Sequence, residues 1–406
     1  MLKNLFHRML LQRHFWRYAS FSEIAELYTS RMLRIAAMYI AGAFMSIYLY
    51  QIGYSVGYIS LFWAAFFLFK VFISLPVASL VARIGPKHGI LVSNVLYIPA
   101  MILFALLPIY GPWLLLPILV LQSTSACMYA IAYTIDFSKV KSVEHAGKEI
   151  AYMNMIEKVT TGISPLIGGV LAFLFGPQVV IVVAAILFAL AAIPLFGSGE
   201  QVQTGVKLQF KGFPWHLIRG HWAAQTAVGF DAFASGTVWT LYTAVIVIGV
   251  SASTNEVYII SGILLSVVLL AALAASYIYG RLIDKKRGGD LMRISSVANA
   301  LTHFIRPFIA SPVTAAGINV ANEIATTGYN MPYTRAVFDN ADLSGHRTTY
   351  LGLVDLLGNF GAFLAAAILG VLFLALGETI ALTNFFFIAG VVALLVLTAR
   401  FSLYKK

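Results

Sequence analysis

Four acidic side chains stand inside long apolar stretches of the chain: Glu157, Asp231, Glu323 and Asp355. A carboxylate taken out of water is costly unless a partner or a proton neutralises it. A carboxyl group whose surroundings alternate between wet and dry can bind and release a proton. These residues therefore offer reversible protonation and the binding of charged groups.

Glu157 begins a polar stripe, because Thr160, Thr161 and Ser164 follow it at helical spacing. Lys158 is a poor partner for Glu157, since adjacent helix positions point about 100° apart. We interpret Glu157 as a proton site, with Lys158 tuning it or reaching toward the membrane surface. The alternative is a structural glutamate held by backbone and hydroxyl groups.

Asp231 and Glu323 stand near the middle of their apolar stretches, and each belongs to a polar face. Ser235 and Trp239 follow Asp231 at helical spacing. The polar neighbours of Glu323 are Asn319, Asn322, Thr326 and Asn330. Each set would form one polar side of a helix.

The composition indicates that a membrane surrounds these groups. Of the 406 residues, 60% are hydrophobic and 11% are charged, and the mean hydropathy is +0.86. Soluble domains carry about 25% charged residues. Cys127 is the only cysteine, which excludes a disulfide within the chain and a cysteine cluster for a metal. We expect no cofactor, and no cleavable signal peptide because no small-residue cleavage site follows the first apolar segment.

The apolar stretches predict an all-α integral membrane protein with twelve transmembrane helices. Each span needs about 20 apolar residues, whereas barrel strands would be about 10 residues long with strict alternation. The predicted spans are 31–52, 57–82, 89–109, 112–136, 150–175, 177–196, 222–249, 257–281, 290–309, 312–337, 348–376 and 378–399.

Lys and Arg predict the orientation in the membrane. Of these 27 residues, all but Lys70, Lys158 and Arg306 lie in the termini, in loops after even-numbered spans, or at the adjoining span ends. Both termini are therefore expected in the cytoplasm, with the protein in the cytoplasmic (inner) membrane. The net charge of +11 follows from this asymmetry, so no nucleic-acid partner is expected. Arg306, near an outer span end, is expected to reach the lipid headgroups.

The predicted organisation has four parts. Residues 1–30 form a basic amphipathic segment on the inner membrane surface. Residues 31–197 and 222–406 form two pseudo-symmetric six-helix bundles, and 198–221 form the cytoplasmic loop between them. A weak internal repeat supports two related halves. It pairs YAIAYT (129–134) with YNMPYT (329–334), and Gly147, Tyr152 and Glu157 with Gly345, Tyr350 and Asp355.

In this topology the chain resembles the major facilitator superfamily over nearly its whole length. That family carries G-x-x-x-D-[RK]-x-G-[RK]-[RK] between spans two and three. Here ASLVARIGPKH keeps Arg83, Gly85 and Lys87, while Ala78 and Ala82 replace the Gly and the Asp. The resemblance implies a gating loop that has lost its usual acidic contact.

A degenerate copy of the motif often follows span eight in this family. Here GRLIDKKRGG keeps Gly280, Asp284 and Lys285, and the later glycine is displaced. We expect this copy to carry the gating contact instead.

A second motif lies in the fifth span. PLIGG, from Pro165 to Gly169, resembles the end of the G-P-x-x-G-G element of drug–proton antiporters in the family, with Ser164 in place of its glycine. It predicts a helix bend at Pro165, Gly168 and Gly169. The alternative is the general use of Pro and Gly in membrane helices for kinks and close packing.

The resemblance implies a secondary transporter with alternating access. We predict proton-coupled export of an organic cation or amphipathic solute, with Glu157, Asp231 and Glu323 as candidates for proton coupling. Uptake by proton symport, or facilitated diffusion of a small polar solute, is the alternative. The family's central cavity is lined by spans seven and ten among others, and the predicted lining is Glu323, Asp231, Asn319, Asn322, Thr326, Asn330, Trp239, Tyr39, Gln122 and Ser125. Acids and amides without an Arg at mid-depth suit a cation better than an anion.

Spans two and eleven pack together in this family. Lys70 and Asp355 stand at similar depths in these spans, so they are predicted to form an ion pair between the halves in at least one state. The expected partners of the protein are the solute, protons and membrane lipids, and a monomer is expected.

Two other classes of membrane protein, an enzyme and a sensor, are alternatives to a transporter. A membrane enzyme would need a nucleophile with a base, or metal ligands, at one depth, and no H-E-x-x-H, G-x-S-x-G or P-loop motif is present. A sensor that moves no solute would have the same sequence features as a transporter.

Overall fold

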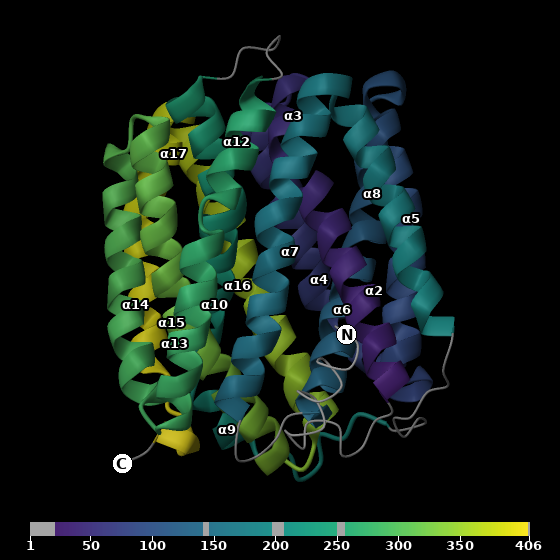
Figure 1. The fold of residues 1–406 in the computed structure, drawn as a ribbon, viewed down its shortest axis with the longest axis vertical. Helices are drawn as coiled ribbons and strands as arrows, with labels where there is room; N and C mark the ends of the chain where they lie inside the picture. The colour runs from purple at the N-terminus through teal and green to yellow at the C-terminus, as the bar shows by residue number, and fades with distance from the viewer. Residues whose placement is uncertain (1–20, 141–145, 197–206, 250–255, 405–406) are drawn as a thin grey trace, which may run out of the picture.

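The structure is a computed structural model, and it describes residues 21–140, 146–196, 207–249 and 256–404. These residues form helices and no strands. They make twelve long helical segments, counting α2 with α3, α10 with α11, and α12 with α13 (Figure 1). The predicted amphipathic segment lies mostly outside the described residues, as do 198–206 of the predicted loop.

The helix bounds follow the predicted spans closely, with extensions of several residues at some ends. The first half contains α2 (Phe21–Ala41), α3 (Met45–Gln51), α4 (Val56–Ile84), α5 (Pro86–Tyr110), α6 (Leu115–Val140), α7 (Ala146–Phe175) and α8 (Pro177–Ala192). The second half contains α10 (Trp222–Phe233), α11 (Trp239–Tyr242), α12 (Glu256–Ser266), α13 (Leu269–Asp284), α14 (Gly288–Ile305), α15 (Pro312–Leu343), α16 (Arg347–Leu376) and α17 (Glu378–Ala393). The short α9 (Trp215–Arg219) lies between the halves in sequence.

Ten segments of the described chain are long and apolar enough to cross a membrane. The two long helices outside that set are α14 and α15, whose polar side chains lower their hydropathy. The all-α membrane architecture is therefore confirmed.

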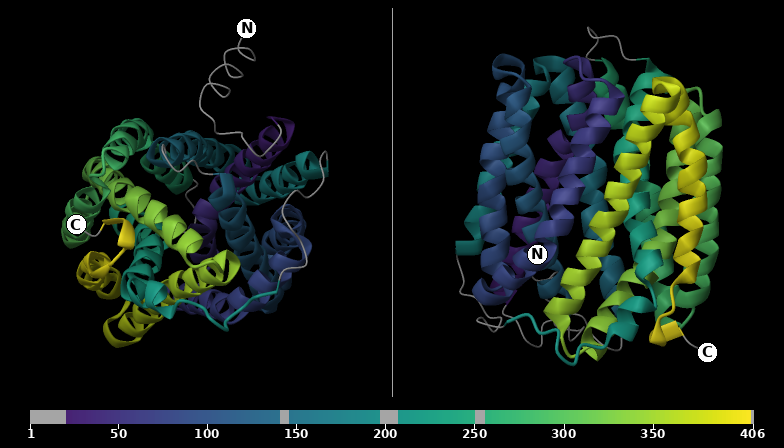
Figure 2. Two further views of the ribbon diagram at one scale, coloured as in Figure 1. Left: turned by 90° about the horizontal axis from the view of Figure 1, so that it is seen from below. Right: turned by 180° about the vertical axis from the view of Figure 1, so that it is seen from behind.

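The two halves lie side by side, the first in purple to teal and the second in green to yellow (Figure 2). The most extensive contacts between them are those of α4 with α16 and of α7 with α12 and α13, and α7 also touches α15. After the undescribed residues 197–206, the chain continues along the first turn of α16. There the backbone N–H of Gln209 donates to Thr349 Oγ1 at 3.3 Å.

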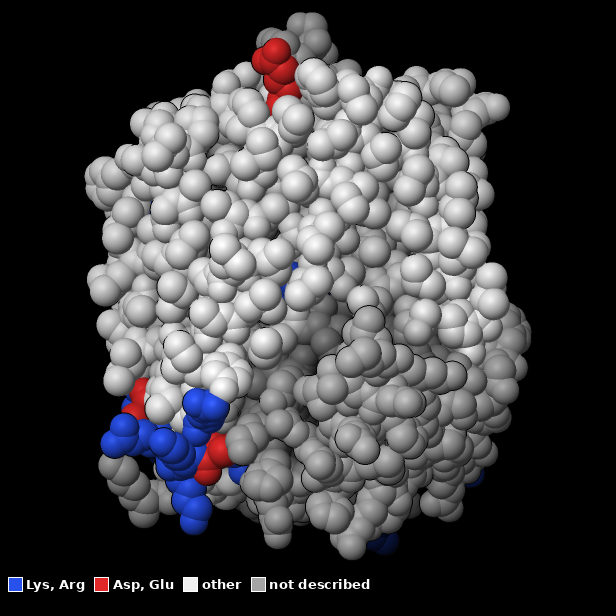
Figure 3. Space-filling model, viewed as in Figure 1, with Lys and Arg blue, Asp and Glu red and all other residues white. Residues whose placement is uncertain are grey.

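The turns define two ends of the bundle. At the far end, the described residues include five glycines with positive φ, at Gly53, Gly111, Gly176, Gly249 and Gly377. At the opposite end, which we call the basic end, the turns contain Gly85, Lys286 and Gly345 with positive φ. Figure 3 shows Lys and Arg gathered at this lower end beneath a broad belt of uncharged residues. Which side of the membrane this end faces stays a prediction.

Glycines of α7 lie where it crosses its neighbours. A Cβ on Gly168 would lie 2.2 Å from the Ile40 carbonyl oxygen, and one on Gly169 would lie 2.6 Å from that of Tyr258. From the other side, a Cβ on Gly262 would lie 2.6 Å from the Pro165 carbonyl oxygen. These glycines allow backbone-to-backbone packing, as expected for small residues in membrane helices. α7 continues as one helix through Pro165, so the predicted bend stays a prediction.

The seventh span departs from regular α-helix. After α10, π-helical turns occupy Ala234–Val238 and Thr243–Ile248 on either side of α11. Such turns often occur at functional sites. Asp231 lies just before the first of them.

Candidate functional site

Two ion pairs meet where α7 contacts the rest of the molecule. Lys158 Nζ of α7 lies 2.8 Å from Glu323 Oε1 of α15, so this pair joins the two halves. One residue earlier, Glu157 pairs with Arg31 of α2, within the first half. The two adjacent charges of α7 therefore point to different helices, as their positions on the helix require.

The side chains of this group are partly exposed. The exposed fractions are 27% for the Lys158 and Glu157 side chains and 14% for that of Glu323. Tyr39 is 41% exposed, although it lies close enough to Lys158, Glu157 and Glu323 to interact with their charges. Those charges come from both halves, so Tyr39 lies where the halves meet. We call Arg31, Tyr39, Glu157, Lys158 and Glu323 the interface cluster.

The structure corrects the interpretation of Glu157 and Lys158. Glu157 has a partner in Arg31, which the sequence did not indicate. Lys158 crosses to Glu323 and so does not reach toward the membrane surface, while its tuning of Glu157 stays a prediction. Sequence reasoning missed Arg31 because it stands at the beginning of its apolar stretch, where a basic residue normally marks the membrane boundary.

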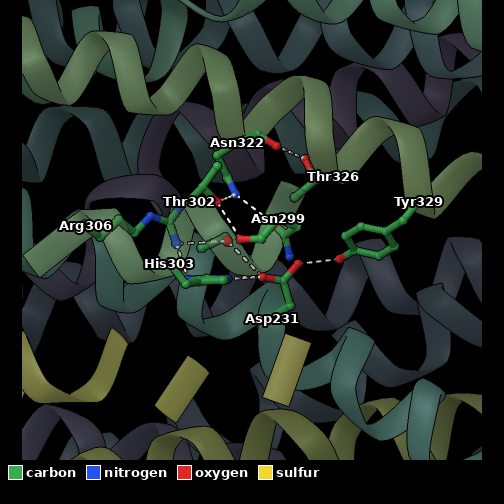
Figure 4. A network of polar contacts seen from close by, with 9 residues as sticks. Asp231, Asn299, Thr302, His303, Arg306, Asn322, Thr326 and Tyr329 are labelled. Atoms are coloured by element: carbon green, nitrogen blue, oxygen red, sulfur yellow. Dashed lines mark hydrogen bonds and ion pairs between the residues drawn. The ribbon is translucent and has the colours of Figure 1, made fainter. Parts of the chain in front are cut away.

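Asp231 belongs to a separate, fully buried network in the second half (Figure 4). Its carboxylate is reached by His303 Nε2 at 2.6 Å and by Ser235 Oγ at 3.1 Å, and Tyr329 donates to its other oxygen. Arg306 Nη1 lies 2.9 Å from His303 Nδ1. A guanidinium group can only donate, so Nδ1 accepts and the ring proton lies on Nε2. His303 is thus a neutral imidazole that links Arg306 to Asp231.

One residue of this network was wrongly interpreted from the sequence, and another was missed. Arg306 was expected to reach the lipid headgroups, but it is 1% exposed and faces the Trp239 ring at 4.8 Å. His303 was not assigned to any site, and it is completely buried against Asp231. Their spacing of three residues on one helix was the available signal, because positions three apart share a face.

Some of the remaining polar side chains of α15 are buried in the protein interior, and others are exposed. Trp239 Nε1 donates to Asn319 Oδ1 at 2.5 Å, and Asn322 donates to Asn299 Oδ1 at 2.8 Å. Thr326 donates to backbone carbonyls of its own helix. Asn330, seven residues from Glu323 and so on the same side of α15, is exposed. A side chain that lines a cavity must be at least partly exposed. Among the residues predicted to line the cavity, Tyr39 and Asn330 are exposed and Glu323 is 14% exposed.

Gln122 and Ser125 lie inside the first half, away from open space. Gln122 donates to the Tyr97 hydroxyl at 2.7 Å. Ser125 donates to the Ser93 carbonyl at 2.6 Å and accepts from Arg34 at 3.3 Å. Arg34 itself is 0% exposed. Arg34 and Arg306 are thus both buried, each near an end of its span, and the expectation that no arginine stands at mid-depth stays a prediction.

Lys70 and Asp355 do not pair in this structure. Asp355 Oδ2 accepts from Ser74 at 2.9 Å and from Asn359 at 2.8 Å. Lys70 Nζ lies 5.4 Å from the Phe67 ring and 5.7 Å from the Phe66 ring. Lys70 is buried and α4 packs on α16, so the ion pair stays a prediction for another conformation.

The two gating motifs lie at the basic end. Gly85 ends α4 with φ of +94°, which explains the glycine, while Arg83 is exposed and Lys87 is buried. In the second copy, Gly280 is buried, Lys285 is exposed, and Asp284 lies 3.7 Å from Arg335. Asp284 thus contacts α15 of its own half, and its assignment as a gate stays a prediction.

The internal repeat corresponds to a repeated contact. Arg34 lies 3.9 Å above the Tyr129 ring, and Tyr329 donates to Asp231. In each half, the same tyrosine of the repeat contacts a buried charge on the half's first helix. The charges have opposite sign. The other repeat pair diverges, because Glu157 binds an arginine and Asp355 binds neutral groups.

The sequence comparison decides the family. A family model described as Major Facilitator Superfamily matches residues 27–321. The chain belongs to the major facilitator superfamily. Its members are transporters and not enzymes, so this transporter is not an enzyme. No curated protein sequence matches it.

Solved transporters share the fold of this superfamily member. The human organic anion transporter MFSD10 aligns with TM-score 0.64 at 11% identity, over 92% of this chain and 99% of that one. A variant of the E. coli fucose:proton symporter FucP aligns with 0.63 at 13%, over 91% and 96%. A POT family transporter in complex with 5-aminolevulinic acid aligns with 0.68 at 14%, over 92% and 94%. At these identities the likeness shows the fold alone.

Proposed function

We propose that this superfamily member is a proton-coupled transporter of a small amphipathic organic solute, with Glu323 as the coupling residue. The observation that carries the proposal is the ion pair of Lys158 with Glu323. Among the described residues it is the only ion pair within 4.0 Å that joins the two halves. A proton on Glu323 removes one of its charges.

Coupling requires that the proton bind the two states of the protein with different affinity. When the halves are arranged as here, the Glu323 carboxylate is paired with Lys158. When the halves move and the pair separates, Glu323 loses that partner, and an unpaired carboxylate away from water is costly unless a proton neutralises it. A proton gradient can therefore bias which arrangement is populated.

The other acids support this choice by their surroundings. Glu157 pairs with Arg31 of its own half, so relative motion of the halves leaves that pair intact. Asp231 is 3% exposed and is enclosed by His303, Ser235 and Tyr329. Glu157 remains a second proton site in the proposal because its side chain is 27% exposed. Asp231 is assigned a structural part.

The charges also inform the solute class. Within the interface cluster the two carboxylates face Arg31 and Lys158, so neither is free to attract a cation. The argument for a cationic solute thus loses its premise. Tyr39, exposed between the halves, suits the apolar part of an amphipathic solute.

For direction, we propose export in exchange for protons, on the resemblance of Pro165–Gly169 to the antiporter element. We further propose a monomer in the cytoplasmic membrane with both termini inside, in contact with lipids. Proton symport is the alternative. The fucose:proton symporter, which shares the fold, is a symporter by name.

The experiment is flux in proteoliposomes with an imposed pH gradient. A panel of neutral, zwitterionic and cationic amphipathic solutes is followed together with internal pH, using the wild type, Glu323→Gln and the matched control Glu256→Gln. Glu256 is exposed at the start of α12. The proposal requires solute and proton movements in opposite directions, present in the control and absent in Glu323→Gln. Movement in the same direction would establish symport, and solute flux without proton flux would refute coupling.

A further inference from the structure

The interior of the first half contains an arginine without an acidic partner. Arg34 of α2 is 0% exposed. Its guanidinium group donates to Asn94 Oδ1 at 2.5 Å, Ser93 Oγ at 3.2 Å and Ser125 Oγ at 3.3 Å. All three acceptors are neutral. No carboxylate of the described residues lies within ion-pair distance of it.

Two other arginines inside the bundle are balanced. Arg31, which is 12% exposed, has Glu157, and the buried Arg306 is linked to Asp231 through His303. A buried charge without a counter-charge is strongly unfavourable in a protein interior. The tyrosine face above Arg34, at 3.9 Å, contributes attraction but carries no net charge. The first half thus holds one positive charge in excess at Arg34.

Unused hydrogen-bond donors surround this charge. Both guanidinium groups lie on stacked tyrosines, Arg34 on Tyr129 and Arg31 on Tyr133, whose ring centroids are 5.9 Å apart. The buried donor atoms that lack any partner here are Arg34 Nε, Arg31 Nε and Nη1, Asn94 Nδ2 and the Tyr129 hydroxyl. Buried donors are normally satisfied. Donors without acceptors, next to an excess positive charge, match the needs of an anion.

We propose that α2, α5 and α6 form a binding site for one monovalent anionic group at Arg34, with Arg31, Asn94 and Tyr129 as further donors. The ligand chemistry is that of a chloride ion or a carboxylate group. One negative charge balances the excess, and the guanidinium fork fits a carboxylate in two-point contact. Water could satisfy the donors but would leave the charge unbalanced.

This site is independent of the coupling proposed at Glu323, because binding there needs no gradient and no transport. The test is the thermal unfolding midpoint of the full chain in lipid nanodiscs at constant ionic strength. Sodium isethionate is replaced stepwise by sodium chloride in one arm and by sodium acetate in the other. The wild type should show a saturable rise in the midpoint. A rise with acetate alone assigns the site to a carboxylate, as on an organic solute, and a rise with chloride assigns it to an inorganic anion.

Three variants identify the site. Arg34→Gln should raise the half-saturating concentration at least about tenfold, the loss expected for a hydrogen bond to a charged group. Tyr129→Phe removes one unpaired donor and should raise the half-saturating concentration less than Arg34→Gln does. Arg219→Gln removes an exposed positive charge of α9 and should leave it unchanged. If Arg34→Gln does not fold, Arg34→Lys replaces it, since it keeps the charge and loses the fork. No saturable rise in the wild type, or the same half-saturation in the Arg34 variant, overturns the proposal.

Discussion

Lys158 of α7 and Glu323 of α15 form an ion pair across the two halves of the molecule, with Nζ and Oε1 2.8 Å apart. The pair lies one residue from another, Arg31 with Glu157, which stays within one half. One contact therefore depends on how the halves are arranged, and its neighbour does not.

The first prediction concerns the strength of this pair. A double-mutant cycle of Lys158→Gln and Glu323→Gln should give a coupling energy of about 1–3 kcal/mol, because removing one partner leaves the other unpaired. The measurement is unfolding in mixed micelles by added SDS. The exposed pair of Arg347 with Asp342 at the basic end serves as control, with an expected coupling of about 0.2–1 kcal/mol. Additive single variants would show that Lys158 and Glu323 do not interact.

The second prediction concerns Arg306. Arg306→Gln leaves the buried Asp231 without its balancing charge and should cost about 3–5 kcal/mol of unfolding free energy. Adding Asp231→Asn should restore part of that loss, since the double variant buries no net charge. The same SDS titration measures both. A double variant as unstable as the sum of the two single ones would contradict the linkage through His303.

A third prediction tests the packing of α7 on α12. The Cβ of Gly262→Ala would lie 2.6 Å from the Pro165 carbonyl oxygen, so the helices must separate, at about 1–3 kcal/mol. Gly317→Ala is the matched control, because nothing lies within 4 Å of its Cβ. That control should be neutral or stabilising by up to about 1 kcal/mol. Equal effects of the two substitutions would rule out close packing at Gly262.

A fourth prediction concerns pH. His221, just before α10, is 1% exposed and lies between the Tyr333 and Tyr350 hydroxyls. Burial lowers the pKa of His221 from 6.5 to about 4. Between these values the unfolded chain takes up a proton that the folded protein refuses, so stability falls as the pH falls from 6.5 toward 4. The loss from this residue is at most about 3 kcal/mol.

The control for this effect is the exposed His216. Unfolding should depend less on pH in His221→Gln than in the wild type, and His216→Gln should follow the wild type. An unchanged pH profile in His221→Gln would show that the buried imidazole does not cause the effect.

The helices and the family were predictable because they depend on composition and length. Runs of about 20 apolar residues must be helices in a membrane. The asymmetry of Lys and Arg also predicted an orientation. The acidic residues of the interior were found for the same reason, since a charge is conspicuous in an apolar stretch.

Their partners were not predictable, because a partner depends on how each helix is rotated and which helix faces it. Lys158 and Glu323 are far apart in sequence, and no local pattern joins them. Arg31 and Arg34 stand near the start of a span, where they resemble residues of the membrane boundary. Arg306 was placed at the headgroups for the same reason, although it lies under Trp239.

The most direct test of the central claim is the distance between the halves as a function of pH. Spin labels at Val92 of α5 and Leu343 of α15, both exposed, report that distance by pulsed electron resonance in nanodiscs. Acidic pH should shift the wild type away from its distance distribution at neutral pH. Glu323→Gln should show the acidic distribution already at neutral pH and change no further. If the wild type and Glu323→Gln respond to pH alike, protonation of Glu323 does not govern the arrangement of the halves.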